Sequence, residues 1–250
     1  MAISKGSSTR REACCFTLAV DCYDAQNMEC IVYAGEREQG YCCRSFIELA
    51  WQMERGFEEM EYPTPSVQKR RFTSFGTLKE GMFQMEGRVV PDRKNGRLGT
   101  FRVHVKQCLH ATWQGKVSRD EKEQESALFE NFLEFTMILD EMLTGSRPDL
   151  RTDTESLTDC LADALLLAGR YDGIRVEEKD SAEVLICGRV LANGGRETFA
   201  VRPLFRENHT FQGSVSWMEG RQQKNFRSFL ELLYLMMSAA GKPAQKDHDM

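Results

Sequence analysis

The residues best suited to chemistry in this chain are its cysteines, which crowd one short stretch. Six of the nine lie within the first 43 residues, at Cys14, Cys15, Cys22, Cys30, Cys42 and Cys43. Thiolates are strong zinc ligands, so a zinc site is the chemistry that such a cluster could support. Here, however, the cysteines include adjacent pairs instead of Cys-x-x-Cys, and adjacent side chains on a strand point to opposite faces. We therefore predict no metal site and expect these cysteines to fill apolar packing positions.

Residues for acid-base or nucleophilic catalysis form no recognisable motif. The chain contains neither Gly-x-Ser-x-Gly nor a glycine-rich phosphate loop. Its four histidines are scattered, at His104, His110, His209 and His248. A general base must be placed beside its substrate by geometry, and nothing in this spacing indicates such a placement. We therefore predict a protein without catalytic residues or cofactors.

The basic residues suggest a different chemistry, the binding of anions. Residues 69–106 contain ten Lys and Arg against three acidic residues, whereas residues 118–143 contain eight Asp and Glu against two basic ones. Such polarity favours a docking surface for an acidic partner or a nucleic-acid backbone, and a merely solvated charged face is the alternative. The predicted basic binding face consists of Lys69, Arg70, Arg71, Arg88, Arg102, His104 and Lys106.

An internal repeat indicates which elements position these residues. HATWQG at residues 110–115 returns as NHTFQG at 208–213, and RSFIEL at 44–49 returns as RSFLEL at 227–232. FLE occurs both at 132–134 and at 229–231, so three copies are recognisable. In each motif we predict a turn, an inward aromatic residue, and a glycine required by crowding against the helix or by a bulge. The structural repeat motif is Trp113, Gln114, Gly115, Phe211, Gln212 and Gly213.

Within each copy the apolar period changes from that of a strand to that of a helix. Phe101, Val103 and Val105 alternate with polar residues, as in a half-buried strand. A helical stripe follows in each copy, and in the third it comprises Phe226, Phe229, Leu230, Leu233, Met236 and Ala240. The expected stripes of the other copies begin at Cys43 and Phe129. We predict an α+β fold of three related strand-strand-(strand)-helix units in pseudo-symmetric packing, with antiparallel sheets each covered by a C-terminal helix.

The predicted domain organisation follows from these copies. A flexible N-terminus (1–13) precedes a diverged first repeat (14–57), and a linker (58–80) leads to the second repeat (81–143). A linker containing a helix at 156–169 (144–171) precedes the third repeat (172–241), and the tail (242–250) is expected to be disordered. Pro203 lies within a predicted strand, which should therefore be an edge strand or contain a bulge.

The repeated pattern Phe-x-Val, Thr-[Trp/Phe]-Gln-Gly-x-Val and Phe-Leu-Glu resembles a small α+β repeat domain of bacterial proteins, a family without a known activity. The third copy, at residues 198–237, resembles it best. The resemblance implies a fold but no catalytic residues.

Composition completes the prediction. The net charge is -5, hydrophobic residues make up 41% of the chain, and no apolar run approaches the length of a membrane span. We expect a cytoplasmic protein without membrane association. Its predicted role is that of a non-enzymatic binding or regulatory scaffold that engages a protein partner. The alternative, which we favour less, is a nucleic-acid or anionic-ligand binder that uses the basic sheet face of the second repeat. The pattern specifies neither the partner, the process nor the oligomeric state.

Overall fold

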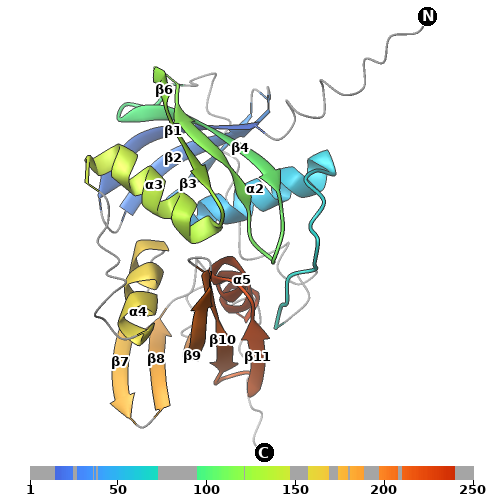
Figure 1. Ribbon diagram of the computed structural model, residues 1–250, viewed down its shortest axis with the longest axis vertical. Coiled ribbons are helices and arrows are strands. Elements are labelled where there is room, and N and C mark those ends of the chain that lie inside the picture. The colour runs from blue at the N-terminus through green and yellow to red at the C-terminus, as the bar shows by residue number, and fades with distance from the viewer. Residues whose placement is uncertain are drawn as a thin grey trace, which may run out of the picture. The chain divides into compact units, whose positions relative to one another are not determined.

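The computed structural model describes residues 15–24, 27–35, 37, 39–72, 95–120, 122–146, 157–168, 174–179, 181–188, 197–207 and 210–239. These residues form two antiparallel sheets and four helices, which confirms the predicted α+β class (Figure 1). The chain divides into two compact units. The first comprises Met1–Gln68, Gly87–Asp149 and Leu167–Gly169, and the second comprises Lys69–Glu86, Leu150–Leu166 and Arg170–Met250.

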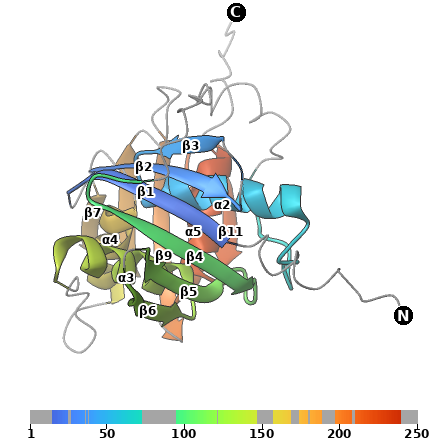
Figure 2. The same cartoon turned by 90° about the horizontal axis from the view of Figure 1, so that it is seen from above.

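The first unit contains a six-stranded sheet in the order β3-β2-β1-β4-β5-β6. Strands β1 and β4 pair antiparallel at its centre, with Phe16 opposite Val103 (Figure 2). The ring of Phe57 on α2 packs edge-on against Phe16 and Trp113, and Trp113 contacts Phe132 on α3. The elements are β1 (Cys15–Asp24), β2 (Asn27–Ala34), β3 (Gly40–Cys43), α2 (Phe46–Met60), β4 (Gly99–Gln107), β5 (Gln114–Arg119), β6 (Lys122–Phe129) and α3 (Phe132–Thr144).

The second unit contains a five-stranded sheet in the order β11-β10-β9-β8-β7. Its core includes Phe199 and Phe211 from the sheet and Phe229 from the last helix, all at most 1% exposed. The elements are α4 (Leu157–Ala168, which belongs to this unit up to Leu166), β7 (Ile174–Lys179), β8 (Ser181–Gly188), β9 (Glu197–Glu207), β10 (Thr210–Trp217), β11 (Gln222–Phe226) and α5 (Phe229–Ala239). Helix α4 confirms the helix predicted at residues 156–169.

Three of the helices begin with the same hydrogen-bonded arrangement. The side chains of Ser45, Asn131 and Ser228 accept hydrogen bonds from the amides three residues later, at Glu48, Glu134 and Glu231. Each glutamate in turn accepts a bond from the amide four residues before it. In this variant of the capping box, the cap side chain satisfies an amide of the first helical turn, and the glutamate binds the amide of the residue before the cap. The predicted helical stripes began three residues too early. Cys43, Phe129 and Phe226 end strands β3, β6 and β11, and the helices begin at Phe46, Phe132 and Phe229.

The first repeated motif forms the predicted turn. His110 and Ala111 both adopt left-handed φ values, 54° and 60°, and the amide of Thr112 donates to the carbonyl of Leu109 at 3.0 Å. Two left-handed central residues are typical of a tight hairpin turn between twisted strands. The hydroxyl of Thr112 then accepts from the amide of Phe132 at 2.9 Å, which joins the turn to the start of α3.

The matching motif makes the same connection in the second unit. The hydroxyl of Thr210 accepts a hydrogen bond from the amide of Phe229, at 3.2 Å, and so joins β10 to the start of α5. Asn208 and His209 of this motif lie outside the described residues. Gln114 fixes its own turn further, because its side-chain amide bonds both the N–H and the carbonyl of Leu109.

The glycine of each motif is required by the close approach of a neighbouring strand. A Cβ added to Gly115 would lie 2.2 Å from the carbonyl oxygen of His104, and one added to Gly213 would lie 2.2 Å from that of Arg202. Neither glycine has a positive φ. Gly115 pairs with Phe129 across the sheet, and Gly213 pairs with Phe226. The crowding therefore comes from the neighbouring strands. The predicted causes were crowding against the helix or a bulge that requires a positive φ.

Pro203 lies beside a bulge, as one of the two predictions stated. The register of β9 and β10 shifts between Gln212 and Gly213, and Gly213 is the partner of Pro203. Strand β9 is not at the edge of the sheet, because it lies between β10 and β8. The pairing with β8 extends only to Val201, so the missing amide of Pro203 interrupts no ladder there.

Candidate functional site

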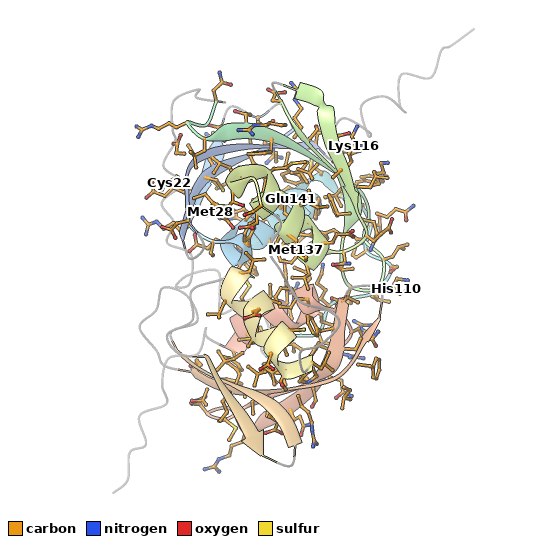
Figure 3. The ribbon with its side chains drawn as sticks, turned by 60° about the vertical axis from the view of Figure 1, so that its left-hand side comes forward. Cys22, Met28, His110, Lys116, Met137 and Glu141 are labelled. Atoms are coloured by element: carbon orange, nitrogen blue, oxygen red, sulfur yellow. The ribbon has the colours of Figure 1, made fainter. Side chains whose placement is uncertain are left out.

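The outer face of β4 carries the cationic residues that the alternation predicts. Phe101, Val103 and Val105 are fully buried, whereas Arg102 and Lys106 are exposed and His104 is partly exposed. Cross-strand partners in a sheet project from the same face, and the partner of His104 is Lys116 on β5. Figure 3 shows Lys116 on the side of the sheet away from α3. The face thus combines Arg102, His104 and Lys106 with a cation that the sequence analysis did not include.

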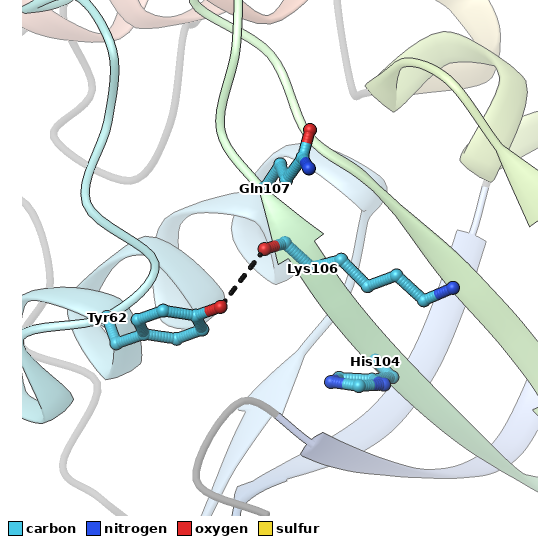
Figure 4. Close-up of a pocket in the computed structure, with 4 residues that line it drawn as sticks. All are labelled: Tyr62, His104, Lys106 and Gln107. Carbon is cyan, nitrogen blue, oxygen red and sulfur yellow. Dashed lines mark hydrogen bonds between the residues drawn. The ribbon is translucent and has the colours of Figure 1, made fainter. Parts of the chain in front are cut away.

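A pocket of about 490 Å³ opens at one end of this face, lined by Tyr62, His104, Lys106 and Gln107 (Figure 4). The Tyr62 hydroxyl donates to the main-chain carbonyl of Lys106 at 3.3 Å. Helix α2 ends at Met60, and its C-cap residue Glu61 has a left-handed φ of 54°, which reverses the chain after the helix. Pro65 then forms a bridge with Cys108, and the amide of Ser66 donates to the carbonyl of Cys108 at 2.9 Å. These contacts hold Tyr62 beside the end of β4.

The side chains of the pocket are suited to an anionic group. Lys106 supplies an ammonium, Gln107 supplies amide N–H donors, and His104 supplies a ring N–H. The lining residues that the structure describes include no carboxylate. Arg102 contributes less to this positive potential, because its Nε lies 2.6 Å from a carboxylate oxygen of Asp120 and the two charges offset each other.

The residues of the predicted basic face are divided between the two compact units. Lys69, Arg70 and Arg71 belong to the second compact unit, whereas Arg102, His104 and Lys106 belong to the first. Arg88 lies outside the described residues. The amide of Arg70 donates to Glu231 on α5, and its guanidinium donates to the carbonyl of Asn225 on β11. The basic stretch 69–71 is therefore engaged in intramolecular packing.

The cysteines follow the packing prediction in part. Cys30 and Cys43 are buried opposite each other on β2 and β3, as predicted for apolar positions. Burial, together with the neighbouring Cys30 thiol, raises the pKa of Cys43 well above its ordinary value. Cys22, in contrast, is exposed, so its predicted packing role is wrong. Cys14 lies outside the described residues. Among the residues that the structure describes, no three His, Cys, Asp or Glu side chains are grouped to hold a metal ion.

One buried acid pairs with a phenol in the first unit. The Tyr23 hydroxyl on β1 donates to Asp140 on α3. Burial raises the pKa of Asp140, and the hydrogen bond from Tyr23 opposes that rise. Burial and the Asp140 carboxylate raise the pKa of Tyr23. This contact joins α3 to the end of β1, and we assign it a structural role.

Comparisons with protein-family models, curated proteins and solved structures found no match. Among the described residues, no helix is long and apolar enough to span a membrane. The interpretation of the pocket therefore depends on its geometry. Sequence reasoning identified His104 and Lys106 through strand alternation, and the same alternation could have identified Lys116. No local pattern could have identified Tyr62, since its place follows from a chain reversal after α2.

Proposed function

We propose that this chain is a non-enzymatic binding protein that docks an acidic segment of a protein partner at the β4 pocket. The observation that carries the proposal is the pocket lined by His104, Lys106, Gln107 and Tyr62, without a carboxylate among its described residues. A partner carboxylate would accept hydrogen bonds from the lysine and the amide, and the Tyr62 ring would contact the partner's aliphatic carbons.

An acidic protein segment suits this surface better than a nucleic acid. The chain has a net charge of -5, and Asp120 already pairs with the exposed Arg102. Two further cations, Lys106 and Lys116, are few for following a phosphate backbone, whose binding depends on many simultaneous charge contacts. Nucleic-acid binding is the competing function, and the experiment below includes it.

We further propose that the scaffold consists of three related units, β1-β2-β3-α2, β4-β5-β6-α3 and β9-β10-β11-α5. Each ends in a helix that begins with the same capping box. Two of them share the threonine bond to the helix start and the glycine-phenylalanine strand pair. In this proposal the repeated contacts build the framework, and residues that differ between the units supply the binding surfaces.

Binding of labelled probes to the full chain tests the function. We would measure fluorescence polarisation with an acidic peptide and with a single-stranded oligonucleotide, at low and moderate salt. The test variant is Lys106→Gln, and the matched control is Arg202→Gln, which removes an exposed cation from β9 of the second unit. We expect Lys106→Gln to weaken peptide binding about fivefold, as for loss of an exposed charge contact worth up to ~1 kcal/mol.

The control decides what the result means. Peptide binding that weakens with Lys106→Gln and is unchanged by Arg202→Gln supports the pocket as the site. Equal weakening by both variants would indicate attraction to net charge alone, and the proposal would be wrong. Binding of the oligonucleotide in preference to the peptide, with a steep loss in salt, would support the nucleic-acid function instead.

A further inference from the structure

Residues 69–72, here called the 69–72 segment, contact one face of α5 without forming a helix or strand. The amide of Arg70 donates to Glu231 at 2.9 Å, and the amide of Phe72 donates to the hydroxyl of Ser238 at 2.7 Å. The ammonium of Lys69 lies 5.2 Å from the centre of the Tyr234 ring. Glu231, Tyr234 and Ser238 are spaced i, i+3 and i+7, so they line one face of the helix.

Strands β10 and β11 complete this contact surface. The guanidinium of Arg70 donates to the carbonyl of Asn225 at 2.8 Å, and the ammonium of Lys224 donates to the carbonyl of Arg71. The ring of Phe72 packs against Trp217, with their centres 5.7 Å apart. The segment is thus bound by main-chain hydrogen bonds and by a small number of side chains, which is how extended peptides are recognised by folded domains.

The other two capped helices show what this face is like without such a segment. The third, sixth and tenth residues are Glu48, Trp51 and Arg55 in α2, and Glu134, Met137 and Glu141 in α3. All six are exposed or partly exposed, and Figure 3 labels Met137 and Glu141 on α3. At the same positions of α5, Glu231, Tyr234 and Ser238 are at most 2% exposed. Because α2 and α3 complete their capping boxes by themselves, helix capping does not require the bond from Arg70.

We propose that α5, β10 and β11 form a groove for an extended basic peptide that ends in an aromatic residue, and that the 69–72 segment occupies it as an intramolecular ligand. The partner is a protein segment of the form basic-basic-basic-aromatic, which displaces the 69–72 segment. Alternate amides of an extended chain point to one side, so Glu231 and Ser238 can both accept hydrogen bonds from the main chain of the bound segment. Tyr234 selects a cation and Trp217 selects a ring. This groove lies within the second unit and is independent of the β4 pocket.

The test uses the full chain and a labelled peptide of residues 68–72, Gln-Lys-Arg-Arg-Phe. The double variant Arg70→Pro/Phe72→Ala removes an amide donor, the guanidinium and the ring of the intramolecular ligand. A tethered ligand competes at a high effective concentration, so we expect the double variant to bind the peptide at least about tenfold more tightly than the unaltered chain. The control peptide Gln-Lys-Arg-Arg-Ala lacks the aromatic residue and should bind more weakly. Equal or absent peptide binding by the two proteins would overturn the proposal.

Hydrogen exchange of the unaltered chain provides a second test that needs no variant. If the 69–72 segment is exchangeable, the amides of Arg70 and Phe72 should exchange well before those in the middle of α5, such as that of Leu233. Exchange of all three amides at one rate would mean that the segment leaves only when α5 unfolds. The segment would then be a fixed part of the core, and the proposal would be wrong.

Discussion

Substitution of Gly115 by alanine should destabilise the first unit more than the same substitution at Gly145, where an added Cβ has no atom within 4 Å. At Gly115 the new Cβ would lie 2.2 Å from the carbonyl oxygen of His104, 2.7 Å from Cζ of Phe129 and 3.0 Å from Cα of Val105. Two of these three atoms belong to the backbone of β4, so a rotamer change cannot relieve the overlap. Strands β4 and β5 must separate, beside the irregularity that already shifts their register.

The magnitude follows from ordinary overpacking. Extra methyl groups in packed cores typically cost about 1–3 kcal/mol, and a backbone overlap belongs at the upper end, so we expect about 3 kcal/mol. Gly145→Ala is the matched control. Gly145 ends α3 with a φ of 77° and has no atom within 4 Å of an added Cβ, so the alanine meets only backbone strain, about 1 kcal/mol.

Urea unfolding followed by tryptophan fluorescence measures both free energies of unfolding. The reasoning predicts that Gly115→Ala lowers the midpoint clearly more than Gly145→Ala does. Gly213→Ala should resemble Gly115→Ala, because its Cβ meets the Arg202 carbonyl at the same 2.2 Å. A Gly115→Ala protein that is as stable as Gly145→Ala would show that β4 and β5 can separate at little cost, and would refute the packing account of the motif.

Three further predictions concern the caps and the titratable groups. Thr112→Val keeps the side-chain shape but removes the hydroxyl that accepts a hydrogen bond from the buried amide of Phe132, so the free energy of unfolding should fall by about 1–3 kcal/mol; an unchanged urea midpoint would contradict this. Iodoacetamide at neutral pH should label the exposed Cys22 well before the buried Cys43, whose pKa is raised by burial and by Cys30, and peptide mass mapping would detect the reverse order. Burial raises the pKa of Glu231, but hydrogen bonds from Arg227 and from the main chain outweigh it, so the folded-state pKa lies below the ordinary 4.5. The stability from this carboxylate is therefore present above pH 4.5 and is lost as pH falls through the folded-state pKa. Unfolding free energies of wild type and Glu231→Gln should converge below pH 4.5, and a constant difference down to pH 2 would contradict the assignment.

The sequence was most informative where local pattern determines structure. Alternation placed Phe101, Val103 and Val105 in the core and Arg102 and Lys106 outside, because a strand repeats every two residues. The matched Arg-Ser-Phe and Phe-Leu-Glu segments located the helix starts, although the stripes were begun too early. A residue that ends a strand and the first residue of the next helix can both be buried, so apolar spacing alone did not separate Phe226 from Phe229.

The contacts that define both proposed sites depend on distant parts of the chain. The pocket requires Tyr62 to lie beside Lys106, 44 residues later, through a bond to a main-chain carbonyl that any residue could supply. Arg70 meets Glu231 across 161 residues. In the sequence, Lys69, Arg70 and Arg71 are the start of a basic run, and a solvent-facing role is the ordinary expectation for such a run. Only the fold shows that their main chain is bound.

The three helix starts explain why a shared motif did not indicate function. Glu48, Glu134 and Glu231 make the same capping bonds, so their recurrence follows from what every such helix needs. The difference appears at the next two turns of the same face. Trp51 and Met137 remain partly exposed, whereas Tyr234 is covered in the second unit. Helices α2 and α3 make the same capping bonds while this face is partly exposed. Covering the face on α5 therefore adds nothing to the capping. The capping of α5 therefore does not account for the contacts of the 69–72 segment, and the displacement experiment measures whether they belong to an exchangeable ligand or to the core of the second unit.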